Sequence, residues 1–400
     1  MESLAQQAQA EVFPHSFMIV QDDIFRASKT LIDTQAGISK LEAMAETKLL
    51  SYHENKSCLL IVGNEEQESK LEKELEETPV LLYNKPMKVA KQAKYLGEEI
   101  KSGVSDSIIA TIKKRTGNVM IAISEIVSLV NDPRANAIGN ISLGLEIWEM
   151  AILPYLLNSA GTWAGINKKA MDLLDKIQKK FLQRLLQVKT APIPLLFWDT
   201  GQLLMSNQIM KMKLLLIHHL ASLEDSSLAK KIYIQQKIKK YPGLVTETRE
   251  ILKKCDLTLD MMETFSKREW KVHVKEFIAT QNTEDLLSMM TPYKKLDVDE
   301  FQREECKLKD YMKDLPYSDA LIQFRLRGKV LNSVKTHFKS EKKYRDDLWS
   351  CEGCSSFLDT SFNILHQCHQ YEDLRDNLNL EKNRRCCDIL QSSFEEKRRI

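Results

Sequence analysis

The sequence of 400 residues lacks long hydrophobic runs. No stretch of about 18 consecutive apolar residues occurs, so we expect no membrane-spanning helix. Residues 1–10 are polar and acidic, whereas a secretory signal begins with a basic segment before an apolar one. We therefore expect a protein of the nucleus or the cytoplasm that is not secreted and has no membrane partner.

Glycine and proline are also scarce, at 13 and 10 residues, and this scarcity favours long helices. An excess of charge of one sign is missing as well, because 58 basic side chains nearly balance 56 acidic ones. The net charge of +2 gives no overall attraction to nucleic acid, so any nucleic-acid surface must be local.

Hydrophobic residues make up 43% of the chain and charged residues 28%, which is enough apolar material for folded cores. The length gives room for roughly two or three domains. Five of the eight cysteines follow residue 350, close to histidines. In a reducing compartment this clustering favours metal binding over disulfides, and the alternative is a set of free thiols.

Two adjacent carboxylates lie between short apolar runs near the N-terminus. An apolar run at 17–20, then Gln21, Asp22 and Asp23, then a second run at 24–25 predicts a β-hairpin. Adjacent carboxylates on a rigid hairpin can bind Mg²⁺ or Mn²⁺ for nucleotide transfer. Aspartate is also common in ordinary turns, so both interpretations stay open.

Apolar periodicity predicts an α+β fold that is mostly α, with a small antiparallel sheet in its first hundred or so residues. The charged segment 64–78 has the composition of a solvated helix face. Strands are predicted over 57–63, 79–83 and 89–96, and helices over 28–53, 108–129, 138–158, 167–188, 205–223 and 230–240.

The most regular amphipathic pattern lies at 168–189, where one side is apolar and the other is basic. Such a basic face can contact nucleic-acid phosphates without reading the base sequence. A second lysine-rich segment, 230–240, has the same potential, and an ordinary solvated face is the alternative for both. The candidate phosphate-binding residues are Lys168, Lys169, Lys176, Lys179, Lys180 and Arg184.

The C-terminal segment contains a candidate zinc site. Cys351 and Cys354 have the spacing of one half of a tetrahedral Zn²⁺ site, and His366 with Cys368 would complete it. His369 can replace His366. A zinc knuckle of this kind would bind single-stranded RNA.

Taken in order, these motifs resemble the reverse transcriptase of non-LTR (LINE-type) retrotransposons, over about residues 15–380. The hairpin with Asp22 and Asp23 is similar to the catalytic box of that family, with Val20 in its aromatic position. The Lys-Tyr-Leu-Gly sequence at 94–97 resembles the primer-side hairpin, and 147–163 resembles part of the thumb.

The resemblance implies an RNA-directed DNA polymerase in which Asp22 and Asp23 bind Mg²⁺ (or Mn²⁺), with an RNA template and a DNA primer as partners. The fingers and the third carboxylate of that family do not precede Asp22, so we expect the chain to be incomplete and inactive alone. The alternatives are a non-enzymatic nucleic-acid-binding relic and a helical protein-interaction module or fragment. The implied domains are a partial palm at 13–102, a helical thumb at 103–240, a helical connector at 241–345 and a Cys/His module at 346–400.

Overall fold

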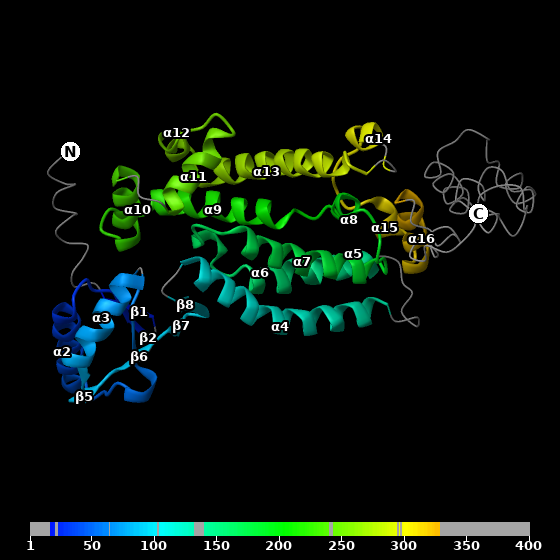
Figure 1. The fold of residues 1–400 in the computed structure, drawn as a ribbon. Coiled ribbons are helices and arrows are strands. Elements are labelled where there is room, and N and C mark those ends of the chain that lie inside the picture. Colours follow the sequence, from blue (N-terminus) through cyan, green and yellow to red (C-terminus); the bar gives the residue numbers. More distant parts are fainter. Residues whose placement is uncertain are drawn as a thin grey trace, which may run out of the picture. The chain divides into compact units, whose positions relative to one another are not determined.

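The computed structural model describes residues 17–20, 23–63, 65–101, 104–131, 140–239, 243–293, 296 and 298–328 (Figure 1). Over these residues the chain is mostly helical with a few short strands, which confirms the predicted class in its coarse form. No helix of this described part is long and apolar enough to cross a membrane.

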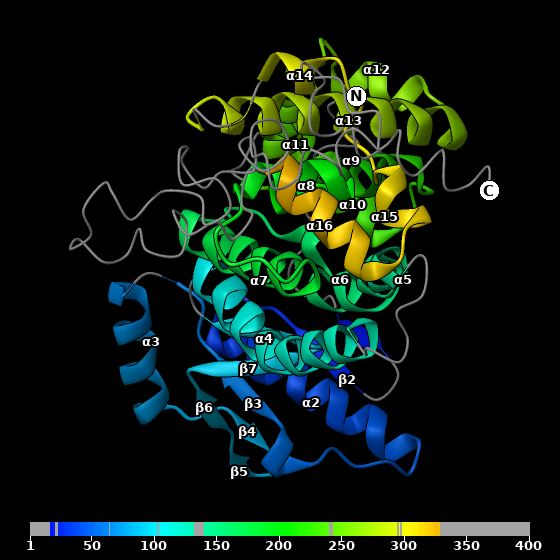
Figure 2. The same ribbon diagram turned by 90° about the vertical axis from the view of Figure 1, so that its right-hand side faces the viewer.

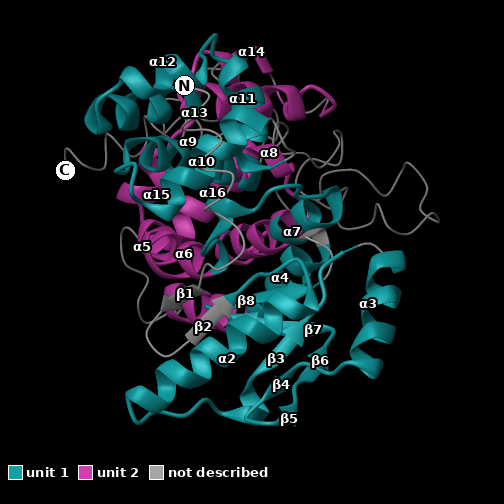
Figure 3. Ribbon diagram, turned by 90° about the vertical axis from the view of Figure 1, so that its left-hand side faces the viewer, with its two compact units in different colours: residues 1–118, 156–174, 205–278 teal, residues 119–155, 175–204, 279–400 magenta. Residues whose placement is uncertain are grey.

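The chain divides into two compact units (Figure 3). Unit 1 contains residues 1–118, 156–174 and 205–278, and unit 2 contains residues 119–155, 175–204 and 279–400. The predicted domain boundaries at 102, 240 and 345 stay predictions.

Among the described residues, eight short strands form four separate pairs, so the predicted single antiparallel sheet is wrong. β3 (Cys58–Leu60) and β6 (Lys88–Ala90), side by side in Figure 2, are parallel because the chain crosses between them through α3 (Glu65–Glu77). The antiparallel pairs are β1 (Phe17–Val20) with β2 (Asp23–Arg26), β4 (Leu81–Leu82) with β5 (Lys85–Pro86), and β7 (Gln92–Tyr95) with β8 (Glu98–Lys101), and the parallel pair is β3 (Cys58–Leu60) with β6 (Lys88–Ala90).

The hairpin predicted near residues 17–25 is confirmed, because Val20 pairs with Asp23 and the chain reverses between them. The strand predicted over 89–96 is instead two strands. β6 and β7 form hydrogen bonds with different partners, β3 and β8, so the chain cannot continue as one straight strand through both.

Helix α2 (Leu31–Thr47) packs on the strands of unit 1. Its first turn is capped by Thr30, whose Oγ1 accepts a hydrogen bond from the Asp33 N–H at 3.1 Å. Gln35 accepts from the Leu81 N–H at 2.7 Å and donates to the Leu81 carbonyl at 3.2 Å, so the helix satisfies the backbone of β4. The buried core here consists of Ile38, Leu75, Val80 and Leu82.

Helices form most of the rest of the described chain. The predicted helices at 108–129, 167–188 and 205–223 are confirmed, with small shifts at their ends. Besides α2 and α3, the helical elements of the described residues are η1 (Glu54–Lys56), α4 (Val104–Val130), α5 (Asn140–Ile147), the π-helical turn η3 (Trp148–Ile152), α6 (Leu153–Leu156), η4 (Ala160–Thr162), α7 (Lys168–Leu185), α8 (Ile193–Thr200), α9 (Met205–Ser222), α10 (Leu228–Lys239), α11 (Leu244–Lys253), α12 (Leu259–Thr264), α13 (Lys267–Met290), α14 (Val298–Gln302), α15 (Asp310–Asp314) and α16 (Tyr317–Arg327).

Helix α8 is not predicted from the sequence, because two prolines indicate only the end of the preceding helix. Pro194 lies in the first turn of α8, where a backbone N–H has no helical acceptor and its loss is tolerated. The predicted helix at 138–158 contains the π-helical turn η3, in which the Leu153 N–H donates to the Trp148 carbonyl. The wider turn lies directly before Pro154, whose ring would otherwise clash with the preceding turn.

Helix α9 is central to the helical part of unit 1 and contacts η4, α10, α11 and α12. Trp270 of α13 donates to the Leu214 carbonyl of α9 at 2.9 Å. His218 is buried and His219 is exposed, as the helical pattern predicts for neighbouring histidines. The other described tryptophans, at positions 148, 163 and 198, are also buried, and Trp349 lies outside the described residues.

A buried ionic network joins distant segments of unit 2. Asp199 of α8 is fully buried and accepts hydrogen bonds from Tyr311 Oη at 2.7 Å and Arg327 Nε at 2.9 Å. Arg327 also donates to Glu304 at 2.9 Å. Burial raises the pKa of Asp199, whereas its hydrogen bonds and the charge of Arg327 act in the opposite direction. The network fixes the segment 304–327 to α8.

Candidate nucleic-acid interface

The predicted catalytic carboxylates, Asp22 and Asp23, follow β1 in the sequence. Asp22 is outside the described residues, and Asp23 begins β2 with its backbone opposite Val20. The structure therefore supports the hairpin and leaves the two carboxylates as a predicted Mg²⁺ site.

The predicted zinc ligands Cys351, Cys354, His366 and Cys368, and the alternative His369, also lie outside the described residues. The part of the chain that the structure does describe contains no group of three or more His, Cys, Asp or Glu side chains able to bind a metal ion. The zinc site stays a prediction.

The predicted primer-side sequence at 94–97 forms the turn between β7 and β8. Leu96 and Gly97 have positive φ angles, 49° and 84°, which is the geometry of a tight hairpin turn that matches strand twist. Leu96 is 48% exposed and Lys94 is exposed beside it. The tip of this hairpin therefore presents an apolar and a cationic side chain to solvent.

Arg115 of α4 holds that turn in place. Its guanidinium donates to the Gly97 carbonyl at 3.3 Å and forms an ion pair with Glu98 at 2.5 Å. It also donates to the carbonyls of Leu156 at 3.2 Å and Asn158 at 2.9 Å. Only 5% of the Arg115 side chain is exposed, so four acceptors satisfy a buried cation in unit 1.

A second contact fastens the same hairpin to α4 one residue pair further from the turn. The buried carboxylate of Glu99 accepts hydrogen bonds from Lys114 and Gln92. The Glu99 N–H donates to Thr111 Oγ1 at 2.8 Å. The hydrogen bond from Lys114 lowers the pKa of Glu99, although burial acts in the opposite direction. The hairpin is thus fixed to α4 at its turn and one residue pair further along its strands.

Helix α7 has the structure that its sequence predicts. Asn167 caps the helix, because its Oδ1 accepts from the Ala170 N–H at 3.0 Å. Its apolar stripe is buried, and Phe181 stacks on Trp148 with ring centroids 4.5 Å apart. The buried residues of this stripe are Ala170, Leu174, Ile177, Phe181 and Leu185.

The opposite face of α7 is the candidate phosphate-binding surface. Lys179 is half-buried, and the other five predicted residues, Lys168, Lys169, Lys176, Lys180 and Arg184, are exposed. None of the five lysines forms an ion pair with a described residue. Arg184 donates to Ser124 Oγ of α4 at 3.0 Å. The face therefore carries cations that the described fold does not neutralise.

The lysines of α10 have a different environment. Lys237 forms ion pairs with Asp260 and Glu263 of α12, both at 2.7 Å, and Lys230 donates to the Ala221 carbonyl. Burial alone would lower the pKa of Lys237, but its hydrogen bonds to the two carboxylates raise it overall. Lys230 and Lys237 therefore have acceptors within unit 1. Of the lysines predicted at 230–240 to contact phosphate, these two are already bound by the protein.

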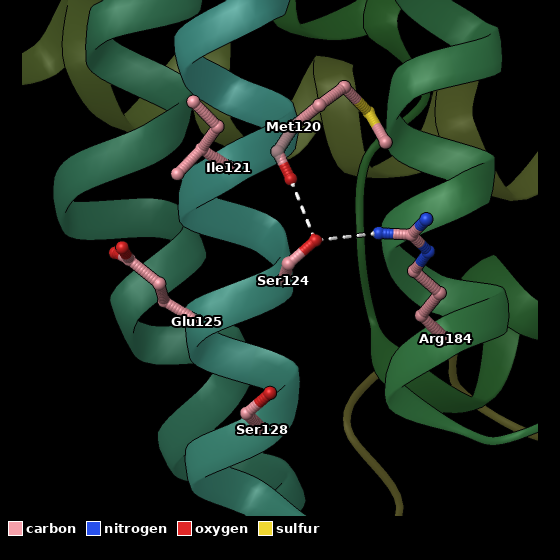
Figure 4. Close-up of a pocket in the computed structure, with 6 residues that line it drawn as sticks. All are labelled: Met120, Ile121, Ser124, Glu125, Ser128 and Arg184. Carbon is pink, nitrogen blue, oxygen red and sulfur yellow. Dashed lines mark hydrogen bonds between the residues drawn. The ribbon is translucent and has the colours of Figure 1, made fainter.

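Helices α4 and α7 border an open groove of about 480 Å³ in unit 2 (Figure 4). Two consecutive hydrogen bonds join its sides. Arg184 donates to Ser124 Oγ, and Ser124 Oγ donates to the backbone carbonyl of Met120, each at 3.0 Å. The lining residues are Met120, Ile121, Ser124, Glu125, Ser128 and Arg184.

No family model matches this sequence, and no curated protein matches it either. The resemblance to reverse transcriptases consequently depends on the order and spacing of the motifs.

Two parts of the interface are missed by sequence reasoning. Arg115 lies between the buried residues Ile112 and Val119 on one face of α4. A single arginine within an apolar stripe is a signal for a buried ion pair, although its partners cannot be identified from periodicity. Ser124 and Ser128 occupy the exposed face of the same helix, four residues apart, and give no signal until α7 is placed beside them.

Proposed function

We propose that this chain is a reverse-transcriptase-like protein of retrotransposon origin that binds nucleic acid through the basic face of α7. The observation that carries the proposal is the set of exposed lysines on α7 that form no ion pair with described residues. In this reading, α7 belongs to a thumb and contacts the backbone of an RNA template paired with a DNA primer. Phosphate contacts of this kind give affinity and position without base specificity.

The spacing of the cations supports a contact with a strand. Lys176, Lys180 and Arg184 follow one another at intervals of four residues, so they lie on one face of the helix. Each interval spans about 6 Å along the helix axis, similar to the separation of neighbouring phosphates in one extended strand.

A matched pair of variants tests this proposal. We expect K176Q/K180Q to lower the affinity for an RNA–DNA hybrid about tenfold at 0.1 M salt, and to reduce the slope of log affinity against log salt by about 2. The control K230Q/K237Q removes the same charge from α10 and should leave the slope unchanged. Fluorescence anisotropy over a salt series measures both. Binding that is indifferent to salt, or equal losses in the two variants, contradicts the proposal.

A second candidate function is RNA-directed DNA polymerisation. The antiparallel β1–β2 pairing supports it, because adjacent carboxylates between two paired strands are the arrangement in which a divalent metal would activate a primer hydroxyl. The chain's own contribution at the primer would be the β7–β8 turn, which Arg115 and Glu99 hold rigidly on α4. The Cys351, Cys354, His366 and Cys368 set would add Zn²⁺ and a single-strand contact.

Primer extension tests this second function. Purified chain with Mg²⁺, a DNA primer and an RNA template should extend the primer if the hairpin is a working catalytic site, and D22A should abolish extension. No extension by the unchanged chain removes polymerisation from consideration, and the binding function is then tested by the salt series alone.

A further inference from the structure

The groove between α4 and α7 in unit 2 has an uneven distribution of charge (Figure 4). Arg184 stands on one side, and the Glu125 side chain points away from it on the other side of α4. The hydroxyl-bearing side chains of Ser124 and Ser128 lie between these two charges. A ligand that fits the groove therefore needs an anionic group next to an uncharged polar group.

The guanidinium of Arg184 has donors to spare. Its hydrogen bond to Ser124 Oγ uses one N–H, and a guanidinium has five, so a phosphate can still be bound through two parallel hydrogen bonds. Lys180 lies one turn earlier on the same exposed face of α7 and would contact the next phosphate.

The serine hydroxyls provide the uncharged part of the site. Ser124 Oγ donates to the Met120 carbonyl and accepts from Arg184, so one acceptor position remains. The Ser128 hydroxyl forms no hydrogen bond with the described residues, and both its donor and its acceptors are available. Ile121, 62% exposed, adds an apolar surface at the same groove.

We infer that this groove binds the ribose–phosphate backbone of an RNA strand, with a phosphate at Arg184 and a ribose 2′-hydroxyl at Ser128. The 2′-hydroxyl donates and accepts hydrogen bonds, and it is the group by which a protein distinguishes RNA from DNA. This inference rests on the proposed function and adds to it which strand of the hybrid lies along α7, namely the RNA strand, and which residue contacts its ribose.

The test compares labelled single-stranded RNA and DNA of one sequence by fluorescence anisotropy with the full chain. We expect the unchanged protein to bind RNA about fivefold more tightly than DNA, the effect of one additional hydrogen bond. S128A should remove this preference by weakening RNA binding alone. S142A, which removes a hydroxyl outside the groove, should retain it. RNA methylated at every 2′-oxygen should bind the unchanged protein no better than DNA.

Other outcomes overturn the inference. Equal affinity of the unchanged protein for RNA and DNA, with salt dependence intact, removes the ribose contact and leaves the phosphate contact of α7 standing. If the unchanged protein shows no salt-dependent binding to RNA or DNA, both the ribose contact and the phosphate contact of α7 are excluded. Equal weakening of RNA and DNA by S128A, or a poly-glutamate peptide that binds as tightly as RNA, shows that the groove does not recognise ribose.

Discussion

Helices α7 and α10 are both rich in lysine, yet the fold uses their charges differently. The lysines of α7 form no ion pair with a described residue, and four of the five are exposed. On α10, Lys237 is bound by two carboxylates of α12, and Lys230 by a carbonyl of α9. The number of basic residues in a segment therefore does not give the number available to a ligand.

The difference has a simple physical origin. The basic face of α7 lies opposite its buried stripe, so its lysines extend into solvent. Most of α10 is half-buried, and its Lys230 and Lys237 reach acceptors on the neighbouring helices α9 and α12. A cation with internal partners contributes to folding stability, whereas a cation without partners is free to bind a polyanion.

The largest expected effect concerns the cation that is paired with the fully buried carboxylate of Asp199. R327M leaves the fully buried carboxylate of Asp199 without its cation, and we expect it to reduce the free energy of unfolding by about 3–5 kcal/mol. Chemical denaturation followed by circular dichroism measures the loss. R325M is the control, because Arg325 donates only an exposed hydrogen bond to the Gln187 carbonyl, and it should change stability by less than about 1 kcal/mol. Similar losses in the two variants would show that the network is not what holds this segment.

A smaller effect separates stability from binding on the two helices. K237Q should reduce stability by about 0.5–1 kcal/mol through its pair with Glu263 and leave nucleic-acid affinity unchanged. K180Q should weaken nucleic-acid binding and leave the free energy of unfolding unchanged. A K237Q protein that binds nucleic acid several-fold more weakly would break the distinction between α7 and α10.

The second ion pair of Lys237, with Asp260, should give a measurable pH dependence. The hydrogen bond from Lys237 lowers the pKa of Asp260 below its ordinary value of 3.8, so the stabilisation is present above that pH and is lost as the pH falls below it. The free energy of unfolding, measured by denaturation at several pH values between about 5 and 3, should therefore fall less with decreasing pH for K237Q than for the unchanged protein. K180Q, which removes a lysine with no such partner, should retain the full dependence.

The smallest expected effect is a gain of affinity. Asp172 is exposed on α7, four residues from both Lys168 and Lys176, and its charge opposes theirs. D172N should strengthen binding to the RNA–DNA hybrid about twofold at 0.1 M salt, with less effect as salt rises. The same substitution should have no effect if the lysines of α7 are merely solvated.

Local features of this protein are predictable from its sequence. The β1–β2 hairpin, the Asn167 cap and the apolar stripe of α7 each depend on residues a few positions apart. The pairs that decide the function of a cation are not local. Arg115 meets carbonyls 41 and 43 positions away, and Lys237 meets Glu263 across 26 positions.

The predicted single antiparallel sheet is wrong for the same reason, because strand pairing also depends on residues far apart in the sequence. Period and turn signals identify strands, but they do not say which strands pair. The crossover through α3 makes β3 and β6 parallel, and different partners divide the strand predicted at 89–96. Side chains such as Ser124 carry no signal in the sequence, because only the neighbouring helix gives them a role.

The network at Asp199 also bears on where this gene can be cut for expression. Asp199 and Arg327 are 128 positions apart, and the bond between them is made only after the later residue has been synthesised. A reading frame that stops near 240, the predicted end of the thumb, encodes α8 without the residues that bind the Asp199 carboxylate. Expression plasmids for the helical region should therefore extend beyond codon 327, and a frameshift upstream of that codon should yield insoluble product.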